Sequence, residues 1–169
     1  NEIDPIGKMT YFSRSQDKII FHWCGANYFS VIDRVESDSI KIIAIDFGSR
    51  QIPDEYKEDI DKIDQGGYNY IYNTPVSNGD HIVFEIMSQN YSNCYLYSMN
   101  NKMMKKNGDR KNISMSYPSC IDEQGRFICL LDSPDEYEMY IENGYPRASK
   151  EIENHIKNGG VIILCYTMK

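Results

Sequence analysis

The sequence predicts an all-β protein built from antiparallel four-stranded sheets, with short helical excursions between them. Short runs rich in β-branched and aromatic residues recur along the chain and are separated by turn residues. The connections are too short for the crossovers that parallel strands need, so the strands are expected to form meanders. Groups of four runs recur every 40 to 50 residues or so, the spacing typical of β-propeller blades. A β-sandwich has a similar strand density and is the alternative fold.

The first predicted blade, residues 9–48, has the clearest strands. They are bounded by turn residues and cover 9–15, 18–24, 27–33 and 39–47. After Pro53 the pattern changes, because acidic residues are followed by Tyr56, Ile60 and Ile63 at helical spacing. This change predicts a helical excursion over 53–65.

Two further blades are predicted at 68–106 and 114–169. The strands of the second blade are expected at 68–73, 81–88, 94–99 and 102–106. Those of the third are expected at 114–121, 126–131, 138–142 and 161–168, with a helix over 148–157 before the last strand. The chain 1–169 is therefore expected to be a single propeller fragment of about three blades.

Composition excludes some classes of function. The formal net charge is −7 and the pI is about 4.9, whereas a nucleic-acid-binding surface needs a basic stripe. No apolar run reaches the roughly 18 residues that a membrane-spanning helix needs. We therefore expect no nucleic-acid partner and no transmembrane segment. Because the chain begins at Asn1 rather than at a methionine, the absence of a leader says little about its compartment.

The five cysteines lack metal-site spacing and are expected to be buried free thiols. Cys120 and Cys129 flank a turn over 122–125. If that turn joins Ile121 to Arg126, Cys120 lies opposite Phe127, and the two sulfurs are then diagonal neighbours. Such a diagonal is poor geometry for a disulfide.

Landmarks at both ends of the chain carry a family resemblance. They are the strand end Ile45-Asp46-Phe47-Gly48, the following Ile52-Pro53 with its helical excursion, and the last strand, 161–169, preceded by a helix. With these landmarks the chain resembles the C-terminal half of six-bladed β-propeller proteins, a largely uncharacterised, lipoprotein-type family of gut anaerobes. The family usually has an Asn-Pro step before the final strand, where this chain has Asn158-Gly159-Gly160.

The resemblance implies an extracytoplasmic protein of the periplasm or cell surface, lipid-anchored through a missing N-terminal region. It also implies a fold with no established catalytic residues, so it supplies no catalytic, metal or cofactor set. Three blades do not close a propeller of four to eight. An open blade edge invites pairing with another chain, and self-association through these edges is therefore expected.

Catalytic motifs are weak in this sequence. Asp46-Phe47-Gly48 matches the magnesium-binding triplet of kinases, but the Gly-rich loop and the catalytic-loop pattern of that class do not occur. His22, His81 and His155 show no metal-ligand spacing. Propeller enzymes draw carboxylates from different blades, so a polysaccharide hydrolase or lyase using residues such as Asp132 and Asp135 stays open as the alternative function.

The function that we expect is a non-catalytic binding or scaffold module for a glycan, peptide or protein partner. Aromatic side chains suit such surfaces, because a flat apolar ring carries a polar edge or tip. The 14 tyrosines and one tryptophan supply them. The candidate ligand-binding residues are Trp23, Tyr28, Tyr68, Tyr70 and Tyr72, each of which has strand packing as its alternative role.

Overall fold

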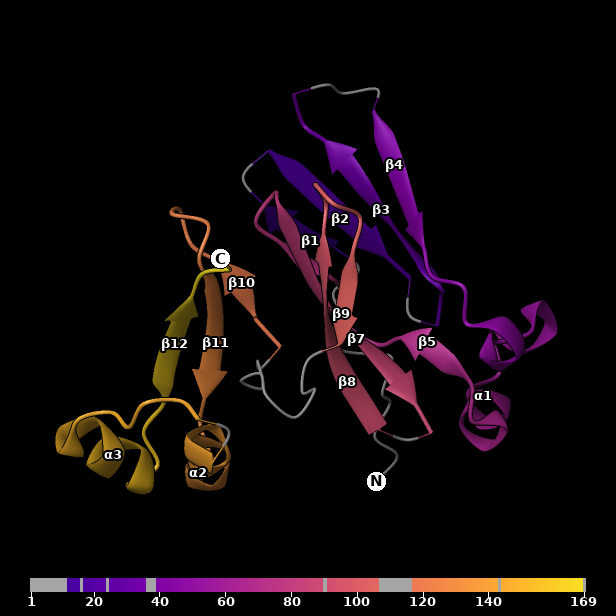
Figure 1. The fold of residues 1–169 in the computed structure, drawn as a ribbon. Coiled ribbons are helices and arrows are strands. Elements are labelled where there is room, and N and C mark those ends of the chain that lie inside the picture. The colour runs from indigo at the N-terminus through magenta and orange to yellow at the C-terminus, as the bar shows by residue number, and fades with distance from the viewer. Residues whose placement is uncertain are drawn as a thin grey trace.

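The computed structural model describes residues 12–15, 17–23, 25–35, 39–89, 91–106, 117–142 and 144–168. The described chain forms three antiparallel sheets and several short helices (Figure 1). The predicted all-β class is therefore confirmed. The predicted residues 9–11, 114–116 and Cys24 lie outside the described residues.

Sheet A is a meander in which every strand pairs with the next one along the chain. Its strands are β1 (Phe12–Ser15), β2 (Lys18–His22), β3 (Tyr28–Asp33) and β4 (Ile40–Ala44). These ranges confirm the four strands of the first group where they are described. The helical excursion is also present, as two short 3₁₀ helices, Gly48–Arg50 and Asp54–Tyr56, and α1 (Ile60–Gly66). Helix α1 begins at Asp59, whose carboxylate accepts from the Lys62 amide, and ends at Gly67 in the left-handed conformation.

Sheet B contains the second group of strands and one that the sequence did not indicate. Its strands are β5 (Asn69–Ile71), β6 (Val76–Ser77), β7 (His81–Ser88), β8 (Tyr91–Ser98) and β9 (Met104–Lys106). Both β5 and β6 pair with β7, so they share one strand position that is interrupted between them. Pro75 lies in the interruption, where its missing amide hydrogen removes a possible ladder bond.

Sheet C has three strands, β10 (Cys120–Ile121), β11 (Phe127–Leu131) and β12 (Ile162–Tyr166). The predicted strand over 138–142 is wrong, because this segment belongs to helix α2 (Pro134–Glu142). Tyr137 and Tyr140, three residues apart, lie buried on one face of that helix. Helix α3 (Lys150–Lys157) follows and begins at Ser149, whose side chain accepts from the Ile152 amide.

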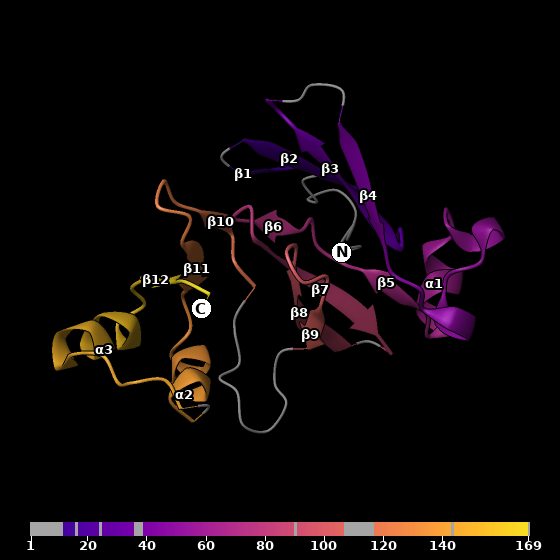
Figure 2. The ribbon, with the colours of Figure 1, turned by 45° about the horizontal axis from the view of Figure 1, so that its top comes forward.

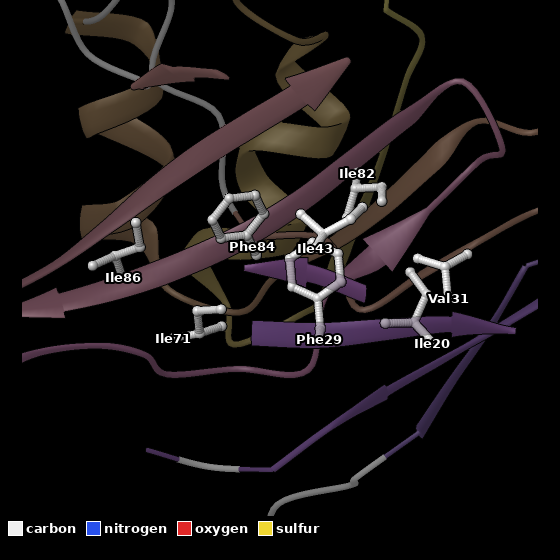
Figure 3. Close-up of a cluster of buried hydrophobic side chains, with 8 residues drawn as sticks. All are labelled: Ile20, Phe29, Val31, Ile43, Ile71, Ile82, Phe84 and Ile86. Atoms are coloured by element: carbon white, nitrogen blue, oxygen red, sulfur yellow. The ribbon is translucent and has the colours of Figure 1, made fainter. Parts of the chain in front are cut away.

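The three sheets pack face to face, with sheet B in the middle. Figure 3 shows the cluster between sheets A and B, where Phe29 and Phe84 bring their ring centroids to 5.6 Å. The next residue of β7, Val83, points to the opposite face and packs with Phe127 of sheet C. Sheet B is thus covered on both faces, whereas sheets A and C each have one face inside the stack. Helices α2 and α3 extend the core of sheet C through Tyr137, Tyr140, Leu131 and Ile156.

Strands β1, β6 and β10 contact one another. The sheets spread from the region where these three strands meet (Figure 2). Side-chain hydrogen bonds reinforce the meeting point, because the Ser13 hydroxyl donates to the Pro75 carbonyl and the Tyr117 hydroxyl donates to the Thr74 carbonyl. The break between β5 and β6 therefore connects sheet B to β1 on one side and to the segment before β10 on the other.

Candidate functional site

The face of sheet A that points away from sheet B carries several exposed apolar side chains. Strand register places Phe12, Phe21, Ser30 and Ile42 in one row across β1 to β4. Their neighbours Ile20, Phe29, Val31 and Ile43 point the other way, into the core between sheets A and B. The row from Phe12 to Ile42 consequently lies on the outer face of the sheet.

A second row on this outer face runs through Arg14, Ile19, Ile32 and Ile40. The exposed fractions are 60% for Phe12, 63% for Ile40 and 64% for Ile42. Phe12 and Phe21 bring their ring centroids to 5.0 Å. Monomeric soluble proteins rarely leave such a contiguous apolar surface uncovered, so a surface of this kind indicates an interaction site. We call these two rows, with Tyr28, the outer face of sheet A.

Two of the predicted aromatic residues lie at one end of sheet A. Trp23 directly follows β2 and is 57% exposed, and Tyr28 begins β3 and is 38% exposed. Because Phe29 is buried against sheet B, strand alternation turns Tyr28 to the outer face. The exposed Trp23 and Tyr28 thus extend the apolar surface toward the turn between β2 and β3.

The backbone of this turn is held by the buried side chain of His22 and the half-buried side chain of Asn27. The imidazole of His22 is buried, with Nδ1 3.1 Å from the Tyr28 carbonyl oxygen and Nε2 3.0 Å from the Ile71 carbonyl oxygen. Burial lowers the pKa of His22, although the two carbonyl oxygens act in the opposite direction. Asn27 donates through its side-chain nitrogen to the Ile45 carbonyl and the Gln51 side-chain oxygen, at 3.1 and 3.0 Å. Trp23 and Tyr28 therefore flank a turn that is fixed to sheet B.

The other three predicted aromatics, Tyr68, Tyr70 and Tyr72, lie elsewhere. Tyr68 is half-buried before β5, with its ring centroid 6.3 Å from that of Tyr56. Tyr70 pairs with Met87 inside β5, and its neighbour Ile71 points into the core shared with sheet A. The Tyr72 amide donates to the Glu85 carbonyl. The three tyrosines therefore belong to the first strand of sheet B and its flanks, away from the outer face of sheet A.

The carboxylates of the alternative enzyme function lie on the surface. Asp132 follows β11 and is exposed, and Asp135 is exposed in the first turn of α2, where an acidic side chain favours the helix N-terminus. Within the described ranges, no group of three or more His, Cys, Asp or Glu residues is arranged to hold a metal ion.

Sequence reasoning missed a half-buried carboxylate, Glu85 of β7. It lies opposite Cys94 in the register of β7 and β8, and it accepts hydrogen bonds from Asn73 and from Ser92, the latter at 3.3 Å. Burial raises the pKa of Glu85. The signal in the sequence was a single acidic residue inside the apolar run 82–86.

The cysteines only partly match expectation. None of the described cysteines forms a disulfide, and Cys94 and Cys129 are buried as expected, whereas Cys120 and Cys165 are exposed. Burial raises the pKa of Cys94 to about 12 and that of Cys129 to about 11, which leaves both thiols protonated and unreactive at neutral pH. Cys120 pairs with Ile128 rather than with Phe127, so the expected register was wrong by one residue.

Comparisons with protein-family models, with curated proteins and with solved structures found no match to this chain. Across the described ranges, every helix is too short or too polar to cross a membrane. The residues of the outer face and their surroundings are thus the basis for inferring a function.

Proposed function

We propose that the protein is a non-catalytic binding or scaffold module that engages a partner through the outer face of sheet A. The observation that supports this proposal is the exposure of Phe12, Ile40 and Ile42 on a regular four-stranded sheet. Removing an exposed apolar sheet face from water stabilises the complex with a partner by roughly 25 cal/mol for each Å² of apolar surface. Because the sheet is preformed, little conformational entropy is lost on binding.

The shape of the surface favours a protein or peptide partner over a small molecule. Two rows of side chains on a sheet form a broad surface, and such surfaces pack well against another sheet or an apolar helix. A glycan is the other partner class, since the exposed indole of Trp23 and ring of Tyr28 offer flat faces to sugar rings. The buried His22 and the half-buried Asn27 hold the turn between β2 and β3 in place.

The architecture and location that accompany this function are also proposals. Two meanders of four strand positions and a third sheet, spreading from β1, β6 and β10, support the interpretation of the chain as part of a β-propeller. The resemblance to extracytoplasmic propeller proteins supports a role at the cell surface or in the periplasm.

A test uses glycan and peptide arrays with the wild-type protein and two variants, Trp23→Ala and Ile42→Lys. We expect wild-type binding to at least one array member, with a loss of tenfold or more in each variant. Ile152→Lys on α3 is the matched control, because Ile152 is an exposed aliphatic residue outside the proposed surface. Cleavage of a bound polysaccharide would contradict the proposal and support the hydrolase or lyase alternative.

A further inference from the structure

Sheet C also has an exposed apolar face. Leu130 pairs with Ile163, and Ile128 lies between Cys120 and Cys165 on the same side of the sheet. Leu130 is 53% exposed and Ile163 is 63% exposed, whereas Phe127 and Leu131, on the opposite side, are fully buried. We call the exposed side the outer face of sheet C. Both terminal sheets of the stack therefore present apolar side chains to water.

This pattern is unusual for the ends of a stack. Proteins built from stacked units normally carry polar outer faces on their terminal units, because those faces meet solvent. Here Ile42 on sheet A and Ile163 on sheet C are as aliphatic as the residues that join sheets A and B in the interior. Each terminal face is suited to receive another sheet in the way that sheet B receives sheets A and C.

The arrangement of the sheets places both faces beside the same open region. Strands β1, β6 and β10 contact one another, and the three sheets spread from them with sheet B between sheets A and C (Figure 2). The outer faces of sheets A and C therefore border the space that the three sheets leave open around this meeting point. A second copy, turned by half a rotation about an axis that runs beside β1, β6 and β10 in this open region, would bring its own outer faces against these two.

We propose that two copies of the chain associate head to tail, the outer face of sheet A on each copy packing on the outer face of sheet C on the other. This inference rests on the proposed function and names the partner of the same surface. The sequence led us to expect self-association through sheet edges, whereas this proposal places the contact on sheet faces. Copies joined by head-to-tail contacts form either a closed ring or an open filament. Two copies form a closed pair when a half-turn relates one to the other.

The contact area favours the closed pair. The three strands of sheet C contain five, five and two residues. Strand spacing and rise give this face a flat footprint of roughly 200 Å². One contact buries about twice that footprint, which is in the range of crystal contacts. Two contacts double the buried area, and projecting side chains bring it to the order of the 1,000 Å² that specific interfaces exceed.

Charge-swapped variants test the pairing of unlike faces. Ile42→Glu places a negative charge on sheet A, and Ile163→Lys places a positive charge on sheet C. By sedimentation equilibrium at about 50 μM, we expect the wild type at twice the chain mass of 19.7 kDa and each variant alone at that chain mass. An equimolar mixture of the two variants regains the dimer mass, because one contact is then wild type and the other brings Glu and Lys together.

The control variant Ile152→Lys stays dimeric, and circular dichroism checks that all variants keep their fold. A monomeric wild type at 50 μM overturns the proposal. So does a dimer that only Ile42→Glu dissociates, which would indicate that sheet A packs on itself, and so does a mixture that remains monomeric. A monomer that still binds an array member through Trp23 and Ile42 overturns the dimer alone and leaves the proposed function intact.

Discussion

His22 shows how one buried residue connects two sheets. Its two ring nitrogens face the carbonyl oxygens of Tyr28 in sheet A and Ile71 in sheet B. A neutral imidazole donates to only one of them, and protonation would allow it to donate to both. Burial nevertheless disfavours the charged ring and lowers its pKa below the ordinary 6.5. The contact is therefore made by a neutral histidine at neutral pH.

This assignment predicts the pH dependence of stability. The lowered pKa of folded His22 means that the unfolded chain binds more protons below about pH 6.5. The stabilisation is present above that pH and is lost as pH falls toward the folded pKa. Urea denaturation at pH 7.5 and pH 5.5 should show a larger loss of unfolding free energy in the wild type than in His22→Gln. His155→Gln, which changes an exposed histidine, should behave like the wild type.

The pH dependence of stability that Glu85 contributes should have the opposite sign to that of His22. Burial raises its pKa in the folded state, so its stabilisation is present below the unfolded pKa and is lost as pH rises through the folded pKa. The Glu85→Gln variant should therefore melt at a higher temperature than the wild type at pH 7, and the difference should narrow toward pH 4. Glu123→Gln, on an exposed turn, serves as the control. A lower melting temperature for Glu85→Gln at pH 7 would contradict this prediction.

The residues of the outer face were only partly predictable from sequence. Trp23 and Tyr28 were singled out because a flat apolar ring with a polar edge or tip suits a binding surface. Phe12, Ile40 and Ile42 were not singled out, because a large apolar residue in a strand is normally part of the core. Only the register, which puts Ile43 rather than Ile42 in the core, shows which side of the sheet is exposed.

At the scale of elements, sequence reasoning missed the interruption between β5 and β6. We call this interruption, with the hydrogen bonds that link it to sheets A and C, the joint. Pro75 breaks the strand, and the short β6 gave no recognisable run of strand residues. The Thr74 and Pro75 carbonyls accept hydrogen bonds from Tyr117 and Ser13, which come from the borders of sheets C and A. Long-range bonds of this kind leave no periodic pattern in a sequence.

The Tyr117→Phe variant tests this joint. It removes the hydroxyl that donates to Thr74 while keeping the half-buried ring among its apolar neighbours. We expect a loss of about 1 kcal/mol in the free energy of unfolding, the usual net contribution of one hydrogen bond. Tyr91→Phe, on a residue that is 76% exposed, should change stability by less than about 0.5 kcal/mol. Equal losses in the two variants, measured by urea denaturation, would contradict the role of the joint.

The other wrong prediction at the scale of elements is the strand over 138–142, which belongs to α2. The segment 138–142 has three consecutive apolar residues, which fits a short strand, but Tyr137 and Tyr140 use helical spacing to pack under sheet C. The Ser133 side chain accepts from the Glu136 amide at 3.4 Å, which supports the first turn of the helix. The run Ser133-Pro134-Asp135-Glu136 is a typical start of a helix, a signal that the expected strand over 138–142 did not take into account.

At the scale of the whole molecule, the order of the three strand groups was predictable and their mutual packing was not. Periodicity identifies strands because it reflects which side chains are buried, but it does not say against what they are buried. Phe84 is an example, since its pairing with Phe29 joins strands more than fifty residues apart in the sequence. The closed propeller stays a prediction.

Phe84→Ala tests how strongly sheets A and B depend on each other. Phe84 is 1% exposed, and its removal leaves a cavity between the two sheets. We expect a loss of about 3 to 5 kcal/mol in the free energy of unfolding. Val35→Thr, at a residue that is 77% exposed and outside the outer face of sheet A, should change it by less than about 0.5 kcal/mol. Urea denaturation, followed both by circular dichroism and by the fluorescence of Trp23 in sheet A, would show whether the sheets unfold together.

Strand β7 pairs with β5 and β6 on one side and with β8 on the other, and neighbouring sheets cover both of its faces. Its backbone amides are hydrogen-bonded to strands on both sides within sheet B, so they exchange only when these ladders open. The amide protons of 82–86 should consequently be the slowest in the described chain to exchange for deuterium, at rates that follow global unfolding. If sheet A or sheet C separates from sheet B, β7 remains paired within sheet B. The order in which the amides of the three sheets become labelled would therefore show which sheet separates first.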